Sequence, residues 1–134
     1  MQVNLNCNCP KPQFGMAIRT NKYVNEVIKT RLNGNISKLD KLEKIFAEAE
    51  KNKAIDIYLM KNPDRNTISA NIYSTNDRVN FFKQMSENFF TKHFGGGIVG
   101  FIEKCSKIAD KAEPKVLKEI QIADALENSK IFNQ

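Results

Sequence analysis

The sequence of 134 residues contains no tryptophan, only one histidine and only four arginines. The histidine, His93, has no adjacent acidic residue, and the sequence pairs it with no serine or cysteine nucleophile. The acidic residues are scattered among lysines, without the paired spacing that general acid and base catalysis uses. We therefore predict no catalytic residues and no cofactor, and an enzyme is the less favoured interpretation.

The chain also lacks a long apolar run and a recognisable leader. No window approaches the roughly 20 apolar residues that a membrane-spanning helix needs. The first residues, MQVNLNCNCPKPQ, do not combine a basic stretch with the apolar core of a secretory signal. A chain of this length can bury a sizeable core without disulfides or metals. We expect a single domain over residues 1–134, located in the cytoplasm.

Cysteine is scarce, with Cys7, Cys9 and Cys105 only. Together with His93, these residues have the number and type of ligands of a Cys₃His zinc site. The C-x-C spacing is tighter than in zinc knuckles, and an odd number of cysteines without a leader favours free thiols. Cys7 and Cys9 fall on the apolar side of an alternating segment, where a free cysteine packs as a small hydrophobic residue. We predict buried thiols and no metal site.

The sequence does contain clear alternation of apolar and polar residues, which is typical of half-buried strands. Four strands are predicted, at residues 3–9, 14–19, 54–60 and 67–74. Residues 62–66, Asn-Pro-Asp-Arg-Asn, have the composition of a turn that joins the last two strands into a hairpin. Aliphatic residues cover one face of this hairpin, and the other face carries Tyr58, Asn71 and Tyr73.

Apolar residues spaced three and four apart predict amphipathic helices. Residues 21–51 fit two such helices, broken at Asn33-Gly34-Asn35, where asparagine and glycine suit a helix C-cap. After the hairpin, a helix is expected to start at Thr75 or Asn76, which can act as its N-cap. Its apolar stripe consists of Val79, Phe82, Met85, Phe89 and Phe90.

The last part of the chain also follows a helical pattern. Apolar residues at helical spacing within residues 98–112 form one stripe. Pro114 suits the first turn of a further helix, where proline loses no helical hydrogen bond. The predicted order is ββααββααα. We therefore predict an α+β fold, in which a four-stranded, mainly antiparallel sheet packs against amphipathic helices.

Three consecutive glycines follow the only histidine in the segment KHFGGGIVG, residues 92–100. Glycines at the start of a helix expose backbone N–H groups to an anion, and the helix dipole adds to the attraction. The segment lacks the GxxxxGK[ST] phosphate-loop pattern and does not follow a predicted strand. We therefore favour a tight corner between two helices and keep anion binding as the alternative. The candidate anion-binding residues are Lys92, His93, Gly95, Gly96 and Gly97.

The net charge is +6, and 17 lysines accompany the four arginines. Residues 1–53 carry ten basic and five acidic side chains, a bias that suits a nucleic-acid-binding surface. Phosphate and base recognition favours the forked guanidinium of arginine, so a solvated, lysine-rich helix face is the preferred interpretation. The candidate nucleic-acid surface consists of Arg31, Lys38, Lys41, Lys44 and Lys51.

These observations favour a small binding protein without catalytic activity. Its partner is expected to be another protein or a second copy of the chain, held through Tyr58, Asn71 and Tyr73 or through an exposed strand edge. A nucleic-acid-binding protein that uses the lysine-rich N-terminal half is one alternative. A protein or enzyme that binds a phosphate-like anion at the glycines is the other.

Overall fold

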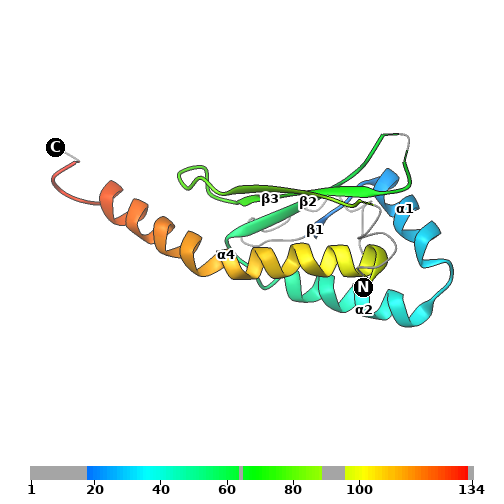
Figure 1. The fold of residues 1–134 in the computed structure, drawn as a ribbon. Helices are drawn as coiled ribbons and strands as arrows, with labels where there is room; N and C mark the ends of the chain where they lie inside the picture. Colours follow the sequence, from blue (N-terminus) through cyan, green and yellow to red (C-terminus); the bar gives the residue numbers. More distant parts are fainter. Residues whose placement is uncertain (1–17, 64, 89–95, 133–134) are drawn as a thin grey trace.

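The computed structural model describes residues 18–63, 65–88 and 96–132. Within these ranges the chain forms an α+β fold with a four-stranded mixed sheet and three helices (Figure 1). The elements, in chain order, are β1 (Ile18–Arg19), α1 (Lys22–Leu32), α2 (Ile36–Ala49), β2 (Ile55–Lys61), β3 (Ile68–Ser74), β4 (Phe82–Ser86) and α4 (Gly97–Glu127). The α+β class confirms the prediction, whereas the order of elements differs from it in part. The predicted strand at residues 3–9 lies outside the described residues.

The sheet has the order β1-β2-β3-β4, with β1 parallel to β2 and the other neighbours antiparallel. The sheet is therefore mixed, and the prediction of a mainly antiparallel sheet is wrong. The reason lies in the connection, because α1 and α2 carry the chain from the end of β1 back to the level of its start. As a result, β2 runs in the same direction as β1. Of the strand predicted at residues 14–19, only Ile18–Arg19 lies within the described residues.

The central hairpin confirms the prediction from alternation, since β2 and β3 each begin one residue later than expected. Ile57 lies opposite Ile72, and Leu59 lies opposite Ala70. All four side chains are fully buried, so they contribute the sheet's share of the core. Apolar burial of this kind stabilises the fold by roughly 25 cal/mol for each Å² removed from water.

Helices α1 and α2 also confirm the prediction, including the break at residues 33–35. The side chain of Asn21 accepts two backbone hydrogen bonds at the start of α1. Asn35 caps α2 in the same way, by accepting from the N–H group of Lys38 at 3.1 Å. Asn33 ends α1 in a left-handed conformation with φ of 49°, which asparagine tolerates well. These asparagines set the sharp turn between the two helices.

β4 replaces the helix predicted after the hairpin, so that prediction is wrong. It pairs antiparallel with β3, and Tyr73 lies opposite Phe82. In the turn between the two strands, the side chain of Asn76 accepts a hydrogen bond from the N–H group of Arg78 at 2.9 Å. The apolar spacing that suggested a helix also fits a short alternating strand. Hydrogen bonding to the free edge of β3 decides in favour of the strand.

α4 is one helix of 31 residues, and the prediction of two helices that meet at Pro114 is wrong. Proline has no N–H group, so the carbonyl of Asp110 receives no helical hydrogen bond. Both residues are exposed, so water can hydrate this carbonyl. Buried residues continue past the proline to Val116, so core packing holds both segments in one helix. At 1.5 Å per residue, α4 is about 46 Å long, and its C-terminal part extends beyond the sheet (Figure 1).

The helices place the first turn of α4 next to the other two helices. α4 packs against β2, β3 and α2, and it also contacts α1. Figure 1 shows α2 and α4 on the same side of the sheet, with α1 near the N-terminal end of α4. Among the helices of the described ranges, none combines the length and the apolarity required to cross a bilayer. The meeting point of the three helix ends is where the candidate site lies.

Candidate anion-binding site

α4 begins at two glycines that both have left-handed backbone conformations. Gly96 has a φ of 80° and Gly97 has a φ of 66°, values that residues with a side chain rarely adopt. A Cβ atom on Gly96 would also lie 3.2 Å from the Cα atom of Gly100. Glycine is therefore required here both for its conformation and for a close backbone approach. The other predicted anion-binding residues, Lys92, His93 and Gly95, lie outside the described residues.

The first turn of α4 presents backbone N–H groups without helical partners. The N–H group of Gly100 donates the first hydrogen bond of the helix, to the carbonyl of Gly96, at 3.2 Å. Gly97, Ile98 and Val99 precede it, and their N–H groups have no carbonyl four residues earlier in the helix. No side chain of the described residues caps this end. A left-handed residue followed by a right-handed one turns successive N–H groups to one side, which is typical of anion-binding turns.

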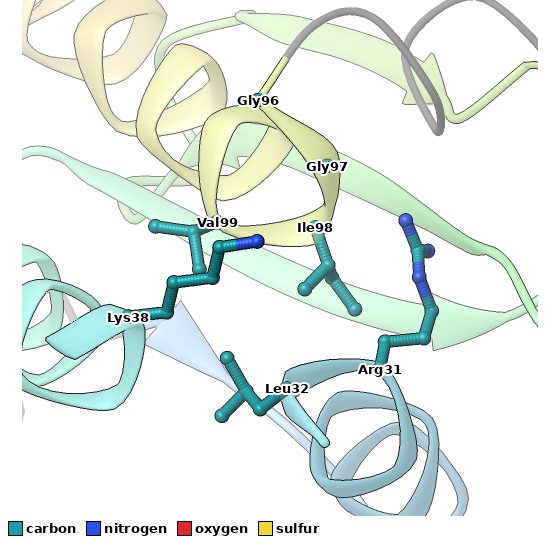
Figure 2. A pocket seen from close by; sticks show the side chains of 7 residues that line it. All are labelled: Arg31, Leu32, Lys38, Gly96, Gly97, Ile98 and Val99. Carbon is teal, nitrogen blue, oxygen red and sulfur yellow. The ribbon is translucent and has the colours of Figure 1, made fainter. Parts of the chain in front are cut away.

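A pocket of about 170 Å³ opens at this turn (Figure 2). The residues that line it come from the ends of three helices and are Arg31, Leu32, Lys38, Gly96, Gly97, Ile98 and Val99. Figure 2 shows the side chains of Arg31 and Lys38 extending from α1 and α2 toward the first turn of α4. The pocket thus combines two cationic side chains with the positive end of a helix dipole.

The structure joins residues that the sequence assigned to two different surfaces. Gly96 and Gly97 were candidates for anion binding, whereas Arg31 and Lys38 were candidates for a nucleic-acid surface. They meet because α1 and α2 both contact α4. The helix break at residues 33–35 was the one sequence feature that could have indicated that Arg31 and Lys38 lie close together. Arg31 lies just before this turn and Lys38 lies just after it. The sequence did not indicate that this turn meets the glycines.

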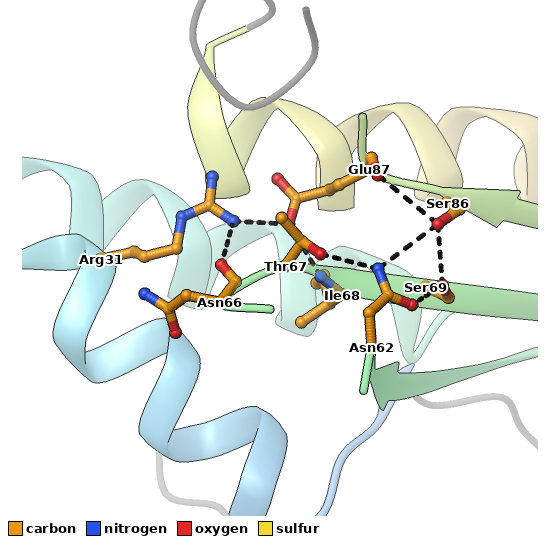
Figure 3. Close-up of polar contacts among 8 residues, drawn as sticks. All are labelled: Arg31, Asn62, Asn66, Thr67, Ile68, Ser69, Ser86 and Glu87. Atoms are coloured by element: carbon orange, nitrogen blue, oxygen red, sulfur yellow. Dashed lines mark hydrogen bonds and ion pairs between the residues drawn. The ribbon is translucent and has the colours of Figure 1, made fainter. Parts of the chain in front are cut away.

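Arg31 is held in place by a buried ion pair with Glu87 (Figure 3). Its Nη1 atom lies 2.5 Å from Oε1 of Glu87 and 3.4 Å from the carbonyl oxygen of Asn66. The side chain of Arg31 is 9% exposed and that of Glu87 is 0% exposed. Within the described part of the chain, Nε and Nη2 of Arg31 donate no hydrogen bond. Two nitrogens of the guanidinium thus have no acceptor among the described residues.

The end of the sheet fixes Glu87 in turn. Its Oε1 atom also accepts a hydrogen bond from the N–H group of Ile68, at 2.9 Å. Its Oε2 atom is buried and accepts no hydrogen bond from any described residue. Beside it, Asn62 accepts a hydrogen bond from Ser69, and the hydroxyl of Ser69 lies 3.0 Å from that of Ser86 (Figure 3). This network ties the turn between β2 and β3 to the end of β4, which Glu87 directly follows.

The five residues predicted as a nucleic-acid surface do not all face solvent. Arg31 is turned inward into its ion pair, whereas the four lysines are exposed on α2 or just after it. Two of these lysines have acidic partners. The Nζ atom of Lys41 lies 3.8 Å from Oε1 of Glu103, and the Nζ atom of Lys51 lies 2.9 Å from Oε1 of Glu48. Nucleic-acid binding through this set stays a prediction.

The predicted interaction residues Tyr58, Asn71 and Tyr73 share the sheet face opposite the buried isoleucines. Tyr58 lies opposite Asn71, and Asp56 lies opposite Tyr73. Asp56 is only 5% exposed, with its Oδ2 atom 3.3 Å from Nη2 of Arg19. Its Oδ1 atom and the Oδ1 atom of Asn71 are buried and accept no hydrogen bond within the described ranges. This face therefore combines aromatic rings with unsatisfied acceptors.

Burial also changes proton binding on this face. It raises the pKa of Asp56 above its ordinary value, although the Arg19 guanidinium opposes the shift. Burial, and next the negative charge of Asp56, raise the pKa of Tyr73. The face thus disfavours negative charge at both positions, which makes it unlike the cationic pocket at α4.

Cys105 is buried on the inner side of α4 and is a free thiol, as predicted. Burial raises the pKa of Cys105 to about 12, so the thiol stays protonated near neutral pH and is a poor nucleophile. Among the residues that the structure describes, no three histidine, cysteine, aspartate or glutamate side chains gather to hold a metal ion. Cys7, Cys9 and His93, the remaining members of the Cys₃His set, lie outside those residues.

Within the described residues, the pocket at α4 and the aromatic sheet face offer a partner contrasting chemistry. The pocket offers positive charge and N–H donors, and the sheet face offers aromatic surface and acceptors. No family model, no curated protein and no solved structure matches this chain.

Proposed function

We propose that the chain is a binding protein that accepts a small oxyanion group, such as a phosphate, in the pocket at the start of α4. One observation carries this proposal. Two cationic side chains, those of Arg31 and Lys38, converge on a helix turn whose N–H groups have no partner among the described residues. Each of these groups attracts negative charge, and together they line one small cavity.

The charge balance in the pocket supports an anionic ligand. The charge of Arg31 is balanced by that of Glu87, so this ion pair contributes little net charge to the pocket. Lys38 supplies a second positive charge, and the end of α4 adds the equivalent of about half a charge. The low exposure of Arg31 limits screening by salt, which strengthens its attraction for a bound anion.

The size of the pocket limits the ligand. Pockets for drug-sized molecules typically measure about 300–1,000 Å³, and this pocket measures about 170 Å³. A single tetrahedral oxyanion fits this volume, whereas the rest of a nucleotide or phosphopeptide would extend into solvent. We therefore expect the pocket to hold either a free oxyanion or the anionic end of a larger molecule.

A titration of the ¹⁵N-labelled chain with inorganic phosphate tests the proposal by NMR. Shifts are expected at the backbone N–H groups of Gly97, Ile98 and Val99, because these three residues line the pocket. Lys38→Gln removes one positive charge from the pocket without disturbing the core, since this side chain is exposed. We expect this variant to bind phosphate about tenfold more weakly, as for the loss of one hydrogen bond to a charged group.

Lys44→Gln is the matched control, because it makes the same charge change on the same helix outside the pocket. This variant should bind phosphate like the unmodified chain. If both variants bound phosphate equally weakly, the affinity would depend only on the net charge of the protein and not on the pocket. The proposal fails if phosphate leaves the N–H signals of the first turn of α4 unchanged.

A second candidate function, association through the sheet face, is favoured by a separate observation. Tyr58 is 36% exposed and Phe82 is 65% exposed, and both share a face with Tyr73. Aromatic residues exposed together on a sheet are typical of protein interfaces. Sedimentation velocity over a range of concentrations tests self-association, which Phe82→Ser should weaken. A single monomeric species at every concentration would rule out self-association.

A further inference from the structure

We infer that a line of lysines along α4 is a docking surface for single-stranded nucleic acid, which it holds by the phosphate groups. This lysine stripe consists of Lys104, Lys107, Lys111, Lys115 and Lys118, and all five residues are exposed. The inference rests on the proposed function, because the strand places one phosphate in the pocket at the start of the same helix.

Helical geometry places the lysine stripe on one narrow side of α4. At about 100° per residue, its five positions fall within an arc of about 80°. Neighbouring lysines are three or four residues apart along the chain, and the whole stripe spans about 21 Å of the helix axis. None of the six acidic residues of α4 falls within this arc. The stripe is therefore a continuous line of positive charge.

Most acidic residues of α4 contact the rest of the fold instead. Oδ1 of Asp110 accepts a hydrogen bond from the side chain of Asn52 at 3.4 Å. Oε2 of Glu113 accepts from the backbone N–H group of Lys53 at 2.7 Å. Two carboxylates near the end of the helix form ion pairs with Arg78. The fold thus uses these negative charges internally and leaves the opposite charge on the outer side of α4.

The lysine stripe itself is nearly free of ion pairs within the described ranges. Lys107 lies 4.0 Å from Oε1 of Glu103, and Lys41 of α2 lies closer to the same oxygen, at 3.8 Å. The other four lysines of the stripe have no described carboxylate within salt-bridge distance. Their positive charge is therefore available to an anionic partner.

The partner that fits such a line is a chain of regularly spaced negative charges. A nucleic-acid backbone carries one charge for each phosphate, and lysines bind it without reading the bases. A duplex winds two strands around a cylinder, so a straight stripe meets only a short stretch of each, whereas a flexible single strand can follow it throughout. A membrane is a poorer partner, because the apolar side of α4 is buried in the core as far as Val116 and cannot insert.

The lysine stripe also leads to the pocket. Gly97 lines the pocket and lies on the same side of α4 as Lys104, about 10 Å before it along the axis. A strand that follows the stripe therefore reaches the N–H groups of the first turn, where Lys38 adds positive charge. The pocket holds one phosphate and the stripe holds the phosphates that follow, so the two cationic features form one site.

Fluorescence anisotropy with a labelled oligothymidine of about 12 nucleotides, a typical length for single-strand sites, tests the inference. For single strands, the logarithm of the affinity falls by about 0.7 per phosphate contact for each tenfold rise in salt. Five contacts on the stripe therefore predict a slope of about −3.5 or steeper. The double variant Lys111→Gln and Lys115→Gln should make this slope shallower by about 1.4 and weaken binding about 25-fold near 0.1 M salt.

The double variant Lys44→Gln and Lys51→Gln is the matched control. It removes the same charge from exposed lysines on α2 or just after it, away from the stripe. These two lysines also belong to the nucleic-acid surface that the sequence predicts. The control should keep the salt slope of the unmodified chain. Equal losses in both double variants would overturn the inference, because the affinity would then follow net charge alone.

Other ligands and an NMR measurement separate the remaining outcomes. Tighter binding of a duplex of the same length, or of phosphatidylserine vesicles, would overturn the choice of a single strand. If inorganic phosphate shifts the N–H signals of Gly97, Ile98 and Val99 but the oligothymidine does not bind, the inference fails and the proposed function stands. If neither binds, both fail. Oligothymidine binding without shifts in this turn would overturn the link between stripe and pocket.

Discussion

Arg78, in the turn between β3 and β4, reaches across to α4, where its Nη2 atom lies 2.5 Å from Oδ1 of Asp124. Its Nη1 atom lies 2.8 Å from Oε2 of Glu127. Both carboxylates lie beyond Val116, the last buried residue of the helix. One side chain from the turn between β3 and β4 therefore connects the body of the protein to the part of α4 that extends past it.

We expect Arg78→Gln to loosen the last turns of α4 and to leave the core unchanged. The measurement is the helical secondary shift of Cα atoms, which should decrease over residues 118–127 and stay constant before Pro114. High salt should reduce the difference from the unmodified chain, because these charges are exposed to solvent. Arg65→Gln, in the turn between β2 and β3, is the control and should leave α4 unaffected. Unchanged shifts in Arg78→Gln would show that the two ion pairs do not hold the helix.

Gly96→Ala should destabilise the protein more than Gly34→Ala. Both glycines have a positive φ, 80° and 75°, so alanine costs about 1–2 kcal/mol of unfolding free energy at either position. A Cβ atom at Gly96 would also lie 3.2 Å from the Cα atom of Gly100. A Cβ atom at Gly34 would meet no neighbouring atom within 4 Å. We expect an additional loss of about 1 kcal/mol at Gly96. Urea unfolding measures both, and equal losses would mean that the close approach is easily relieved.

Arg31→Met should strongly reduce the free energy of unfolding, because it leaves the carboxylate of Glu87 buried without its cation. Breaking a buried ion pair in this way typically costs about 3–5 kcal/mol. The double variant with Glu87→Met removes both charges and should recover part of this loss. A double-mutant cycle from urea unfolding gives the coupling energy. Additive effects of the two substitutions would contradict a coupled buried pair.

Asp56→Asn should change the pH dependence of stability. Burial raises the pKa of Asp56 above 3.8, so the folded state keeps a proton that the unfolded chain has already released. The contribution of Asp56 to stability is therefore complete below this value and decreases as pH rises through the pKa of the folded state. Asparagine does not titrate, so the variant should gain relative to the unmodified chain from about pH 4 toward neutrality. Urea unfolding at several pH values checks this, and a constant difference would contradict it.

The elements that could be predicted were those with a regular pattern supported by turn residues. The β2–β3 hairpin has an alternating pattern on both strands and a typical turn between them. α1 and α2 have apolar stripes and asparagine caps. In these segments local preference and tertiary packing agree, so the sequence alone was sufficient.

The errors arose where tertiary contacts decided between two local possibilities. The segment that became β4 is only five residues long, and its apolar spacing fits either a strand or a helix. Pro114 is compatible with a helix start, and only packing on both sides of it keeps α4 continuous. The parallel pairing of β1 depends on how α1 and α2 return the chain, which no local pattern encodes.

The candidate site was predicted only in part, for a related reason. The glycines were recognised because their preference for left-handed conformations is a local property. Arg31 and Lys38 were noticed as basic residues, but their position at the start of α4 results from helix packing. Glu87 carried no signal in the sequence, since its role depends on burial beside a residue from a distant helix.

The change in burial along α4 has a consequence for how the chain can be handled. Ile98, Phe101 and Ile102 anchor the first turns in the core, whereas Ile122 and Leu126 are largely exposed. The free energy of local unfolding therefore decreases from the pocket toward the far end of the helix. Truncation there, or attachment of a fluorophore or a surface tether, should cost little stability. The same long helix thus offers a natural attachment point well away from the site where a ligand would be held.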